Sequence, residues 1–182
     1  MNLKARNIVE ANNLTIIYPS NNKSVLRNFN LKINKNEHTA IIGESGCGKS
    51  TFAKSIVQML PPNTICEGDL IVDRKDLRKI SKKELMIFRR TRIGFIYQDS
   101  IQKLNPLMTV GDHLYELLKI HLPSKSNKYI SQIVKETFHK VGIEENRLKS
   151  FPHEFSGGMR QRVCIALALS LIHISEPTRR IH

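Results

Sequence analysis

The first third of the chain is a succession of short apolar runs rich in β-branched residues, each bounded by turn-forming residues. Two such runs cover Ile8–Ala11 and Leu14–Tyr18, a turn-rich stretch fills positions 19–22, and a third run covers Val25–Ile33. Runs of this kind predict strands, and the polar stretches between them predict turns. Because no helical segment separates these strands, we expect an antiparallel sheet beside the main fold.

Further apolar runs predict additional strands. Thr39–Ile42 is followed by a glycine-rich loop and then by helical spacing over Ser50–Leu60, which stops at two prolines. Glu67–Val72 and Ile93–Tyr97 are further strand candidates, the second of them of the buried type. A strand, a loop and a helix in direct succession are typical of nucleotide-binding folds.

Helical patterns dominate the second half of the chain. Ser81 and Glu84 fit a capping box that opens a basic helix, and Thr109 is suited to cap a helix that ends near His121. The next helix is predicted by an apolar stripe that ends at Gly142 and consists of Ile130, Ile133, Val134, Phe138 and Val141. These segments predict a helical subdomain.

Composition limits the possible classes of protein. The chain has 182 residues, of which 40% are hydrophobic, enough for one domain with a smaller subdomain. Its three cysteines are odd in number and widely spaced, so we expect free thiols in a reducing compartment. No apolar run approaches the roughly 18 residues of a membrane span, which predicts a cytosolic chain or one that lies against a membrane.

The net charge of +13 would suit a polyanionic partner such as nucleic acid or anionic lipid. However, Lys and Arg are spread along the chain, with local clusters at Lys82–Lys83 and Arg89–Arg90 and no basic tail interleaved with aromatic residues. This distribution favours solvated basic faces plus one phosphate site over a nucleic-acid groove.

The most informative motif is the stretch Gly43–Thr51, which fits the pattern G-x-x-x-x-G-K-S/T. In such a loop the glycines turn backbone N–H groups toward phosphate oxygens, Lys49 adds a positive charge, and the Ser50 hydroxyl can hold Mg²⁺. The residues predicted to bind a nucleoside triphosphate here are Gly43, Ser45, Gly46, Gly48, Lys49, Ser50 and Thr51.

Three further candidates lie outside the loop. Tyr18 ends a predicted strand and could stack on a purine, although an ordinary sheet aromatic is an equal alternative. Gln98 follows Ile93–Tyr97 at the strand end where such folds place ligands. Ser156 precedes Gly157 and Gly158 at the start of an apolar helix, where backbone N–H groups could approach an anion.

In this order, the motifs resemble those of the ATP-binding subunits of ABC transporters. Tyr18 matches the adenine-stacking aromatic of that family, Gly43–Thr51 its Walker A loop, Gln98 its Q-loop glutamine and Phe155–Met159 its signature motif. The resemblance extends from about Ile8 to Ala168. It implies an α/β fold: a P-loop NTPase core with an antiparallel β-subdomain and a helical subdomain.

Two segments resemble one branch of the family in particular. The segments Leu104–Gly111 and Met159–Arg162 look like those of the branch that imports peptides and nickel. Ser100 stands where that branch often has proline, which is a small departure. The resemblance also sets the expected layout: 1–98 as the β-subdomain and Walker A core, 99–155 as the helical subdomain and 156–168 as the signature helix.

The resemblance implies a mechanism in which two subunits enclose two ATP molecules, with a cytoplasmic location at the membrane. Lys49 would contact the β- and γ-phosphates, while Ser50 and Gln98 would serve Mg²⁺ and the attacking water. Ser156, Gly157 and Gly158 would reach the γ-phosphate bound by the second subunit. The helical subdomain and Q-loop would contact a membrane permease, and no nucleic-acid partner is expected.

The family's catalytic Asp and Glu follow the signature motif, and no clear match to them occurs here. Ile174–Thr178 echoes the family's Asp-Glu-Pro-Thr, but Ser175 replaces the metal-binding Asp and no turn separates it from the signature helix. We therefore expect the C-terminal part of the core sheet to be missing and the catalytic site to be incomplete.

The segment from about Leu169 to His182 looks like a translated sequencing adapter, and we expect residues 169–182 to be non-native. Genomic sequence across this junction tests the expectation, which fails if the genome encodes Ile172–Ser175.

Two alternatives remain at this point. One is an ABC-type ATPase without a membrane partner, which a neighbouring permease gene would argue against. The other is a basic nucleic-acid-binding protein, which predicts salt-sensitive binding to DNA or RNA that ATP does not displace.

Overall fold

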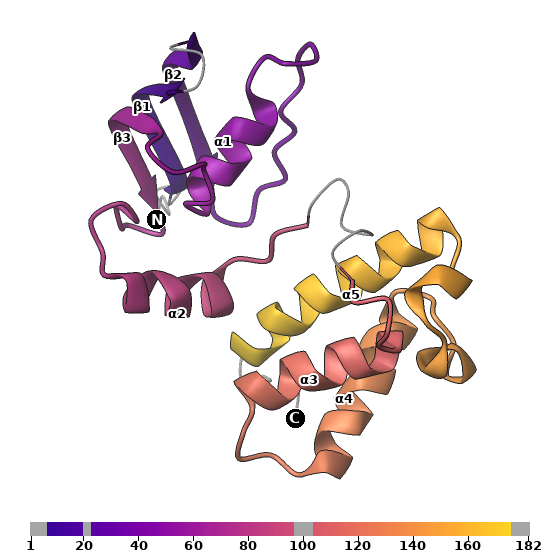
Figure 1. Cartoon of the computed structure of the whole chain (residues 1–182). Coiled ribbons are helices and arrows are strands. Elements are labelled where there is room, and N and C mark those ends of the chain that lie inside the picture. The colour runs from indigo at the N-terminus through magenta and orange to yellow at the C-terminus, as the bar shows by residue number, and fades with distance from the viewer. Residues whose placement is uncertain (1–6, 20–22, 97–103, 176–182) are drawn as a thin grey trace, which may run out of the picture. The chain divides into compact units, whose positions relative to one another are not determined.

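The computed structural model describes residues 7–19, 23–96 and 104–175 of the chain. It divides into two compact units, Met1–Leu85 and Met86–His182 (Figure 1). The boundary expected at residue 98 lies outside the described residues. No helix in the described ranges combines the length and apolarity that crossing a membrane requires.

The first unit contains a three-stranded antiparallel sheet, as the pattern of short apolar runs predicted. Its strands are β1 (Asn7–Tyr18), β2 (Lys23–Asn34) and β3 (Ile65–Val72), arranged in the order β2-β1-β3. The two runs expected before position 19 belong to a single strand, β1. This strand has an irregularity around Asn13, whose φ is 48°. Alternating side chains of β1 face a core, as a half-buried strand requires.

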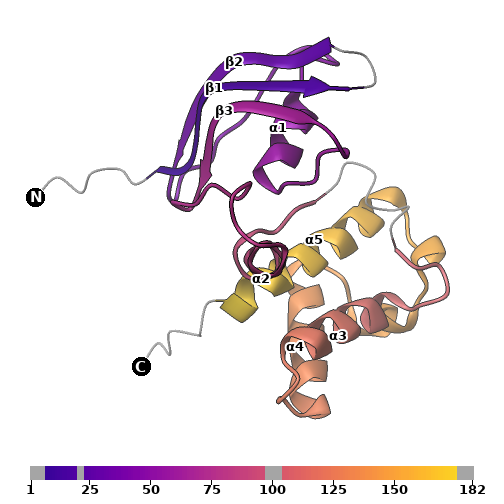
Figure 2. The same ribbon diagram turned by 60° about the vertical axis from the view of Figure 1, so that its left-hand side comes forward.

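Helix α1 (Lys49–Ile56) lies on one face of this sheet (Figures 1 and 2). Phe52 of α1 packs against Phe29 of β2, with ring centroids 4.8 Å apart. The helix ends one turn before the predicted position at Leu60. Gln58 adopts a φ of 53°, and the amides of Gln58 and Met59 bond back to the carbonyls of Ser55 and Lys54. This arrangement is a Schellman motif, which terminates the helix before the prolines are reached.

Two predicted core strands are not formed. Residues 39–42 and 93–96 belong to no helix or strand, and Tyr97 lies outside the described residues. Ile42 is 92% exposed, although it belongs to an apolar run. Buried strands of an α/β core require neighbouring strands to satisfy their backbone groups. The described sheet consists of β1, β2 and β3, so it offers neither segment such a neighbour.

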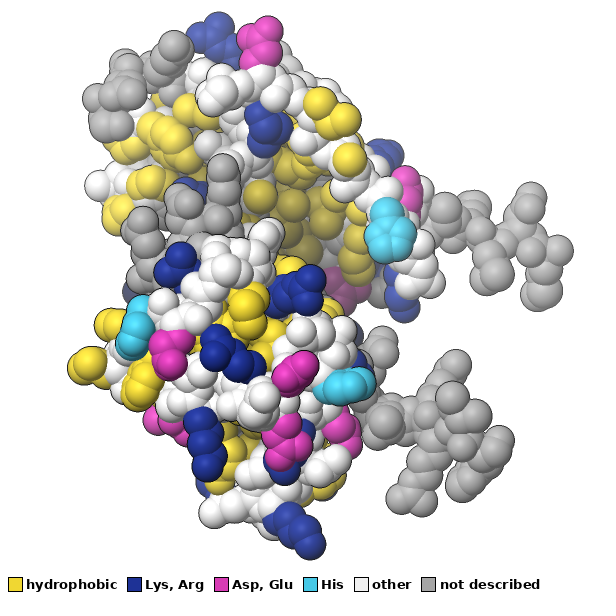
Figure 3. Space-filling model, turned by 90° about the vertical axis from the view of Figure 1, so that its right-hand side faces the viewer, with side chains coloured by type: hydrophobic (Ala, Val, Ile, Leu, Met, Phe, Trp, Pro, Cys, Tyr) yellow, Lys and Arg dark blue, Asp and Glu magenta, His cyan; other side chains and the backbone are white. Residues whose placement is uncertain are grey.

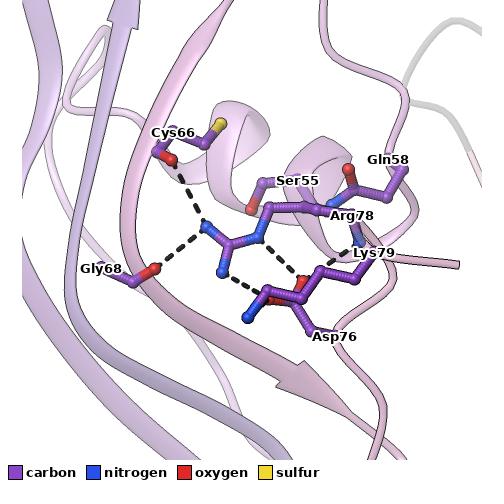
Figure 4. Close-up of polar contacts among 7 residues, drawn as sticks. All are labelled: Ser55, Gln58, Cys66, Gly68, Asp76, Arg78 and Lys79. Atoms are coloured by element: carbon purple, nitrogen blue, oxygen red, sulfur yellow. Dashed lines mark hydrogen bonds and ion pairs between the residues drawn. The ribbon is translucent and has the colours of Figure 1, made fainter.

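The free edge of β3 is covered by a compact ion pair (Figure 4). Arg78 donates two hydrogen bonds of 2.8 Å to the carboxylate of Asp76, and its Nη1 also donates to the carbonyls of Gly68 and Cys66. The hydrogen bonds from Arg78 lower the pKa of Asp76, whose side chain is only 8% exposed. Burial raises the pKa of the Cys66 thiol. The pair holds the segment after β3 against the strand edge.

Helix α2 (Lys82–Arg92) begins with the predicted capping box. The amide of Ser81 donates to the Glu84 carboxylate at 3.0 Å, and the amide of Glu84 donates to the Ser81 hydroxyl at 3.2 Å. These two bonds satisfy amides that the first turn leaves without intrahelical partners.

The second unit is helical. It contains α3 (Val110–His121), α4 (Asn127–Lys140), α5 (Gly157–Ser175) and the short 3-10 helices η2 (Glu145–Lys149) and η3 (Pro152–Glu154). Helices α3, α4 and α5 pack on one another around a shared apolar core (Figure 1).

The helix boundaries of this unit follow local sequence signals. Thr109 caps α3 by accepting from the amide of Asp112, as predicted, and Ser126 caps α4 by accepting from the amide of Tyr129. The predicted stripe faces the core, with Ile130 and Phe138 fully buried. Helix α5 runs without a break to Ser175, so the segment that echoes Asp-Glu-Pro-Thr does not begin as a strand.

Charged side chains of both signs share the protein surface. On the face shown in Figure 3, Lys and Arg are interspersed with Asp and Glu rather than gathered into a single basic groove. Such mixing is typical of solvated faces.

Candidate nucleotide-binding site

The loop predicted to bind phosphate forms an irregular turn that leads directly into α1. Gly46 and Gly48 have φ values of 84° and 98°, in the left-handed region that favours glycine. A Cβ at position 48 would also lie 2.7 Å from Cδ2 of Leu26 in β2. The conformation and the close packing therefore both require glycine at position 48.

The ammonium group of Lys49 bonds across the loop. Its Nζ donates to the carbonyls of Gly43 at 2.7 Å and Glu44 at 2.6 Å, and it lies 3.6 Å from Sγ of Cys47. These acceptors are neutral, so they leave the positive charge uncompensated. A phosphate oxygen could replace them with a stronger, charge-assisted bond.

The first turn of α1 adds to the positive charge of Lys49. It contains Lys49 but no acidic residue, so the positive end of the helix is not neutralised by its own side chains. The side chain of Ser50 is exposed in this turn. Amides, ammonium and hydroxyl together fit a polyphosphate ligand.

The residues also fit a magnesium ion held jointly with phosphate. Among the described residues, no group of three or more His, Cys, Asp or Glu side chains is placed to hold a metal. Mg²⁺ commonly binds through one or two protein oxygens, substrate phosphates and water. The Ser50 hydroxyl can supply one of those oxygens.

Tyr18 lies beside the phosphate loop, at the end of β1. Its hydroxyl is 3.0 Å from the Thr51 hydroxyl, and Thr51 is 8% exposed on α1. The structure thus brings together the aromatic residue and the loop, which the sequence suggested separately. The hydrogen bond between Tyr18 and Thr51 was not predicted, because no local pattern relates residues 33 positions apart.

The serine-glycine-glycine motif begins α5 in the second unit. Ser156 caps the helix by accepting from the amide of Met159 at 3.4 Å, as predicted. A Cβ built on Gly157 or Gly158 would meet no other atom within 4 Å, so packing does not require glycine at either position. A helix start without side chains allows close backbone approach to an anion.

The predicted site residues are therefore distributed over two units. Tyr18 and the loop residues from Gly43 to Thr51 lie in the first, and Ser156 to Gly158 lie in the second. Gln98 lies outside the described residues. The sequence predicted no role for Cys47, although its thiol contacts the Lys49 amine. The position of Cys47 inside the motif was the one sequence feature that pointed to this contact.

Comparison with known proteins identifies the family. The ABC transporter family model matches residues 26–172. The chain is 42% identical to the dipeptide transport ATP-binding protein DppD of Bacillus subtilis, over 84% of the chain and 48% of that protein. It is 38% identical to the oligopeptide transport ATP-binding protein OppD of the same organism, over 97% of the chain and 52% of that protein. It thus spans about half the length of these relatives.

Solved structures agree with this assignment. The dimeric ATP-binding cassette MJ0796, in a post-hydrolysis state bound to ADP and Pi, superposes with a TM-score of 0.77 at 31% identity, over 89% of this chain and 69% of that one. A second dimeric structure of MJ0796 gives a TM-score of 0.78 at 30% identity, with the same coverage. The chain therefore belongs to the ABC transporter family and has the α/β fold of its ATP-binding cassettes.

Proposed function

We propose that the chain is the ATP-binding part of the energy subunit of a peptide importer. The relatives' names, which refer to dipeptide and oligopeptide transport, support the transporter over an ABC ATPase without a membrane partner. The observation that carries the proposal is the Lys49 ammonium, held by neutral carbonyls inside a loop whose helix carries no acid in its first turn.

In this role the first unit holds the nucleotide. Lys49 binds the β- and γ-phosphates, the loop amides bind their oxygens, and Tyr18 stacks on the adenine. Ser50 and Gln98 would hold Mg²⁺, which would neutralise charge on the phosphates. The charge and the glycine conformations of the described loop support these assignments for its own residues.

The second unit acts on a nucleotide bound by another subunit. Ser156, Gly157 and Gly158 offer an open, capped helix start to the γ-phosphate held there. The dimeric cassette structures support pairing of two such subunits, of this chain or of a related one. Permease subunits would anchor the pair at the cytoplasmic face of the membrane.

ATP binding by the full chain tests the proposal. We expect the chain to bind ATP weakly in the presence of Mg²⁺, as measured by calorimetry or by displacement of a fluorescent ATP analogue. Lys49→Ala should lower the affinity at least tenfold, because hydrogen bonds to charged groups contribute about 1.5–3 kcal/mol each. Lys54→Ala is the matched control, since Lys54 lies in the last turn of the same helix.

The two variants distinguish specific phosphate binding from a general effect of charge. Loss of binding in Lys49→Ala but not in Lys54→Ala supports the phosphate loop. Equal effects of both substitutions would indicate a nonspecific response to charge and contradict the proposed site.

A further inference from the structure

The hydrogen bond between Tyr18 and Thr51 joins the two ends of the proposed nucleotide site. Tyr18 ends β1 and Thr51 lies in the first turn of α1, and their hydroxyl oxygens are 3.0 Å apart. Thr51 is 8% exposed, so its hydroxyl has little access to water. This bond is thus a defined contact between the predicted adenine platform and the phosphate-loop helix.

Thr51 lies in the first turn of α1, where its own helix offers no backbone carbonyl one turn earlier for the hydroxyl to bond. The Thr51 hydroxyl instead reaches across 33 residues of sequence to a side chain on the sheet. The contact therefore constrains the Tyr18 ring rather than the helix backbone.

We propose that Thr51 is a positioning residue that fixes the ring of Tyr18 for stacking on the nucleotide base. This inference rests on the proposed function and adds a specific role for the Thr51 side chain. The bond restricts the orientation of the ring, so less freedom is lost when a base stacks on it. Preorganisation of this kind improves affinity by lowering the entropy lost on binding.

The expected size of the effect follows from the strength of a neutral hydrogen bond. A net contribution of about 0.5–1.5 kcal/mol corresponds to a change in affinity of roughly two- to tenfold. In Tyr18→Phe, which leaves the phosphate loop intact, the effect should appear with ATP, which has a base, and not with inorganic tripolyphosphate, which lacks one. The ratio of the two affinities is therefore the quantity to measure.

The test compares Tyr18→Phe, Thr51→Val and Thr51→Ser in the full chain. Tyr18→Phe keeps the stacking ring and removes only the hydroxyl. Thr51→Val removes the other hydroxyl at similar volume, and Thr51→Ser restores it. Matched controls are Tyr129→Phe on α4 and Thr64→Val after α1, which make the same chemical changes elsewhere.

We expect Tyr18→Phe and Thr51→Val each to weaken ATP relative to tripolyphosphate by about two- to tenfold. The double variant should be no weaker than either single variant, because one bond is lost in all three. Thr51→Ser should recover the wild-type ratio. If Tyr18→Phe leaves the affinity for ATP relative to tripolyphosphate unchanged, or raises it, the inference is overturned. Such a result would mean that the bond does not affect nucleotide binding or competes with it.

A measurement without nucleotide separates this inference from the proposed function. The ¹³Cζ resonance of Tyr18 should shift in Thr51→Val and return in Thr51→Ser if the hydroxyl bond forms in solution. A wild-type chain that binds neither ATP nor tripolyphosphate contradicts the proposed function. Normal ATP binding with no shift of the Tyr18 resonance contradicts the positioning role alone.

Discussion

Cys47 is the exposed thiol of the phosphate loop and contacts the amine of Lys49. If ATP binds in the loop, its phosphates should shield this thiol from alkylating reagents. We expect ATP to slow alkylation of Cys47 by iodoacetamide several-fold, as followed by peptide mass spectrometry.

Cys164 is an internal control for that experiment, because it is buried in the helical unit. Its alkylation should be slow with and without ATP. Equal alkylation rates of Cys47 in the two conditions would place the nucleotide elsewhere.

Arg74 occupies a backbone conformation that suits glycine. Asp73 and Arg74 have φ values of 43° and 68° in a two-residue turn, closed by hydrogen bonds in both directions between Val72 and Lys75. Consecutive left-handed residues define a type I′ turn, which strongly favours glycine. Arg74→Gly should therefore raise the free energy of unfolding by about 1 kcal/mol, as measured by urea denaturation.

The opposite result is expected for Arg90→Gly in α2, where glycine should cost about 1 kcal/mol of helix stability. Similar destabilisation by both substitutions would show that the turn conformation does not determine how glycine at position 74 changes the free energy of unfolding.

At the residue scale, local chemistry was predictable and distant contacts were not. The turn at the candidate phosphate loop, with Gly46 and Gly48 in the left-handed region, was predictable because its glycines, Lys49 and Ser50 follow one another in sequence. The bond between Tyr18 and Thr51, and that between Arg78 and the carbonyl of Gly68, depend on how the chain folds back on itself.

At the scale of elements, helix starts were predictable from local sequence and core strands were not. Ser81 and Thr109 cap their helices as predicted, because capping depends on residues within one turn. The segments 39–42 and 93–96 have the composition of strands but do not form them. A strand is stable only with a paired neighbour, and an apolar run cannot show whether such a neighbour is present.

The ion pair between Asp76 and Arg78 makes the β3 edge sensitive to acid. Arg78 lowers the folded-state pKa of Asp76, so the stabilisation is fully present above the unfolded value of about 3.9. It is lost as the pH falls through the lower folded-state pKa. Asp76→Asn should therefore lower the free energy of unfolding by about 2 kcal/mol at neutral pH.

The difference between wild type and Asp76→Asn should shrink in acid, which denaturation at several pH values would show. Glu67→Gln is the control, because Glu67 is exposed on the same strand. A difference that stays constant down to pH ~2 would argue against a contribution from the Asp76 charge.

At the scale of the whole molecule, the proposed nucleotide site lies in a chain whose sequence gives no clear match to the Asp and Glu expected after the signature motif. We therefore expect the purified 182-residue chain to release no phosphate from Mg²⁺-ATP above the background rate, in a continuous phosphate-release assay.

Turnover that is abolished by Lys49→Ala would contradict this prediction. Turnover that survives Lys49→Ala would instead point to a contaminating ATPase in the preparation.

The exposed segment at residues 39–42 has a consequence for how firmly the phosphate loop is held. Among the described residues, no strand pairing protects these amides, whereas β1 is paired on both sides. In deuterated water, the amides of 39–42 would exchange almost as fast as those of an unstructured peptide, and those of β1 would exchange far more slowly. The loop is thus anchored firmly through α1 and only loosely through the residues that precede it.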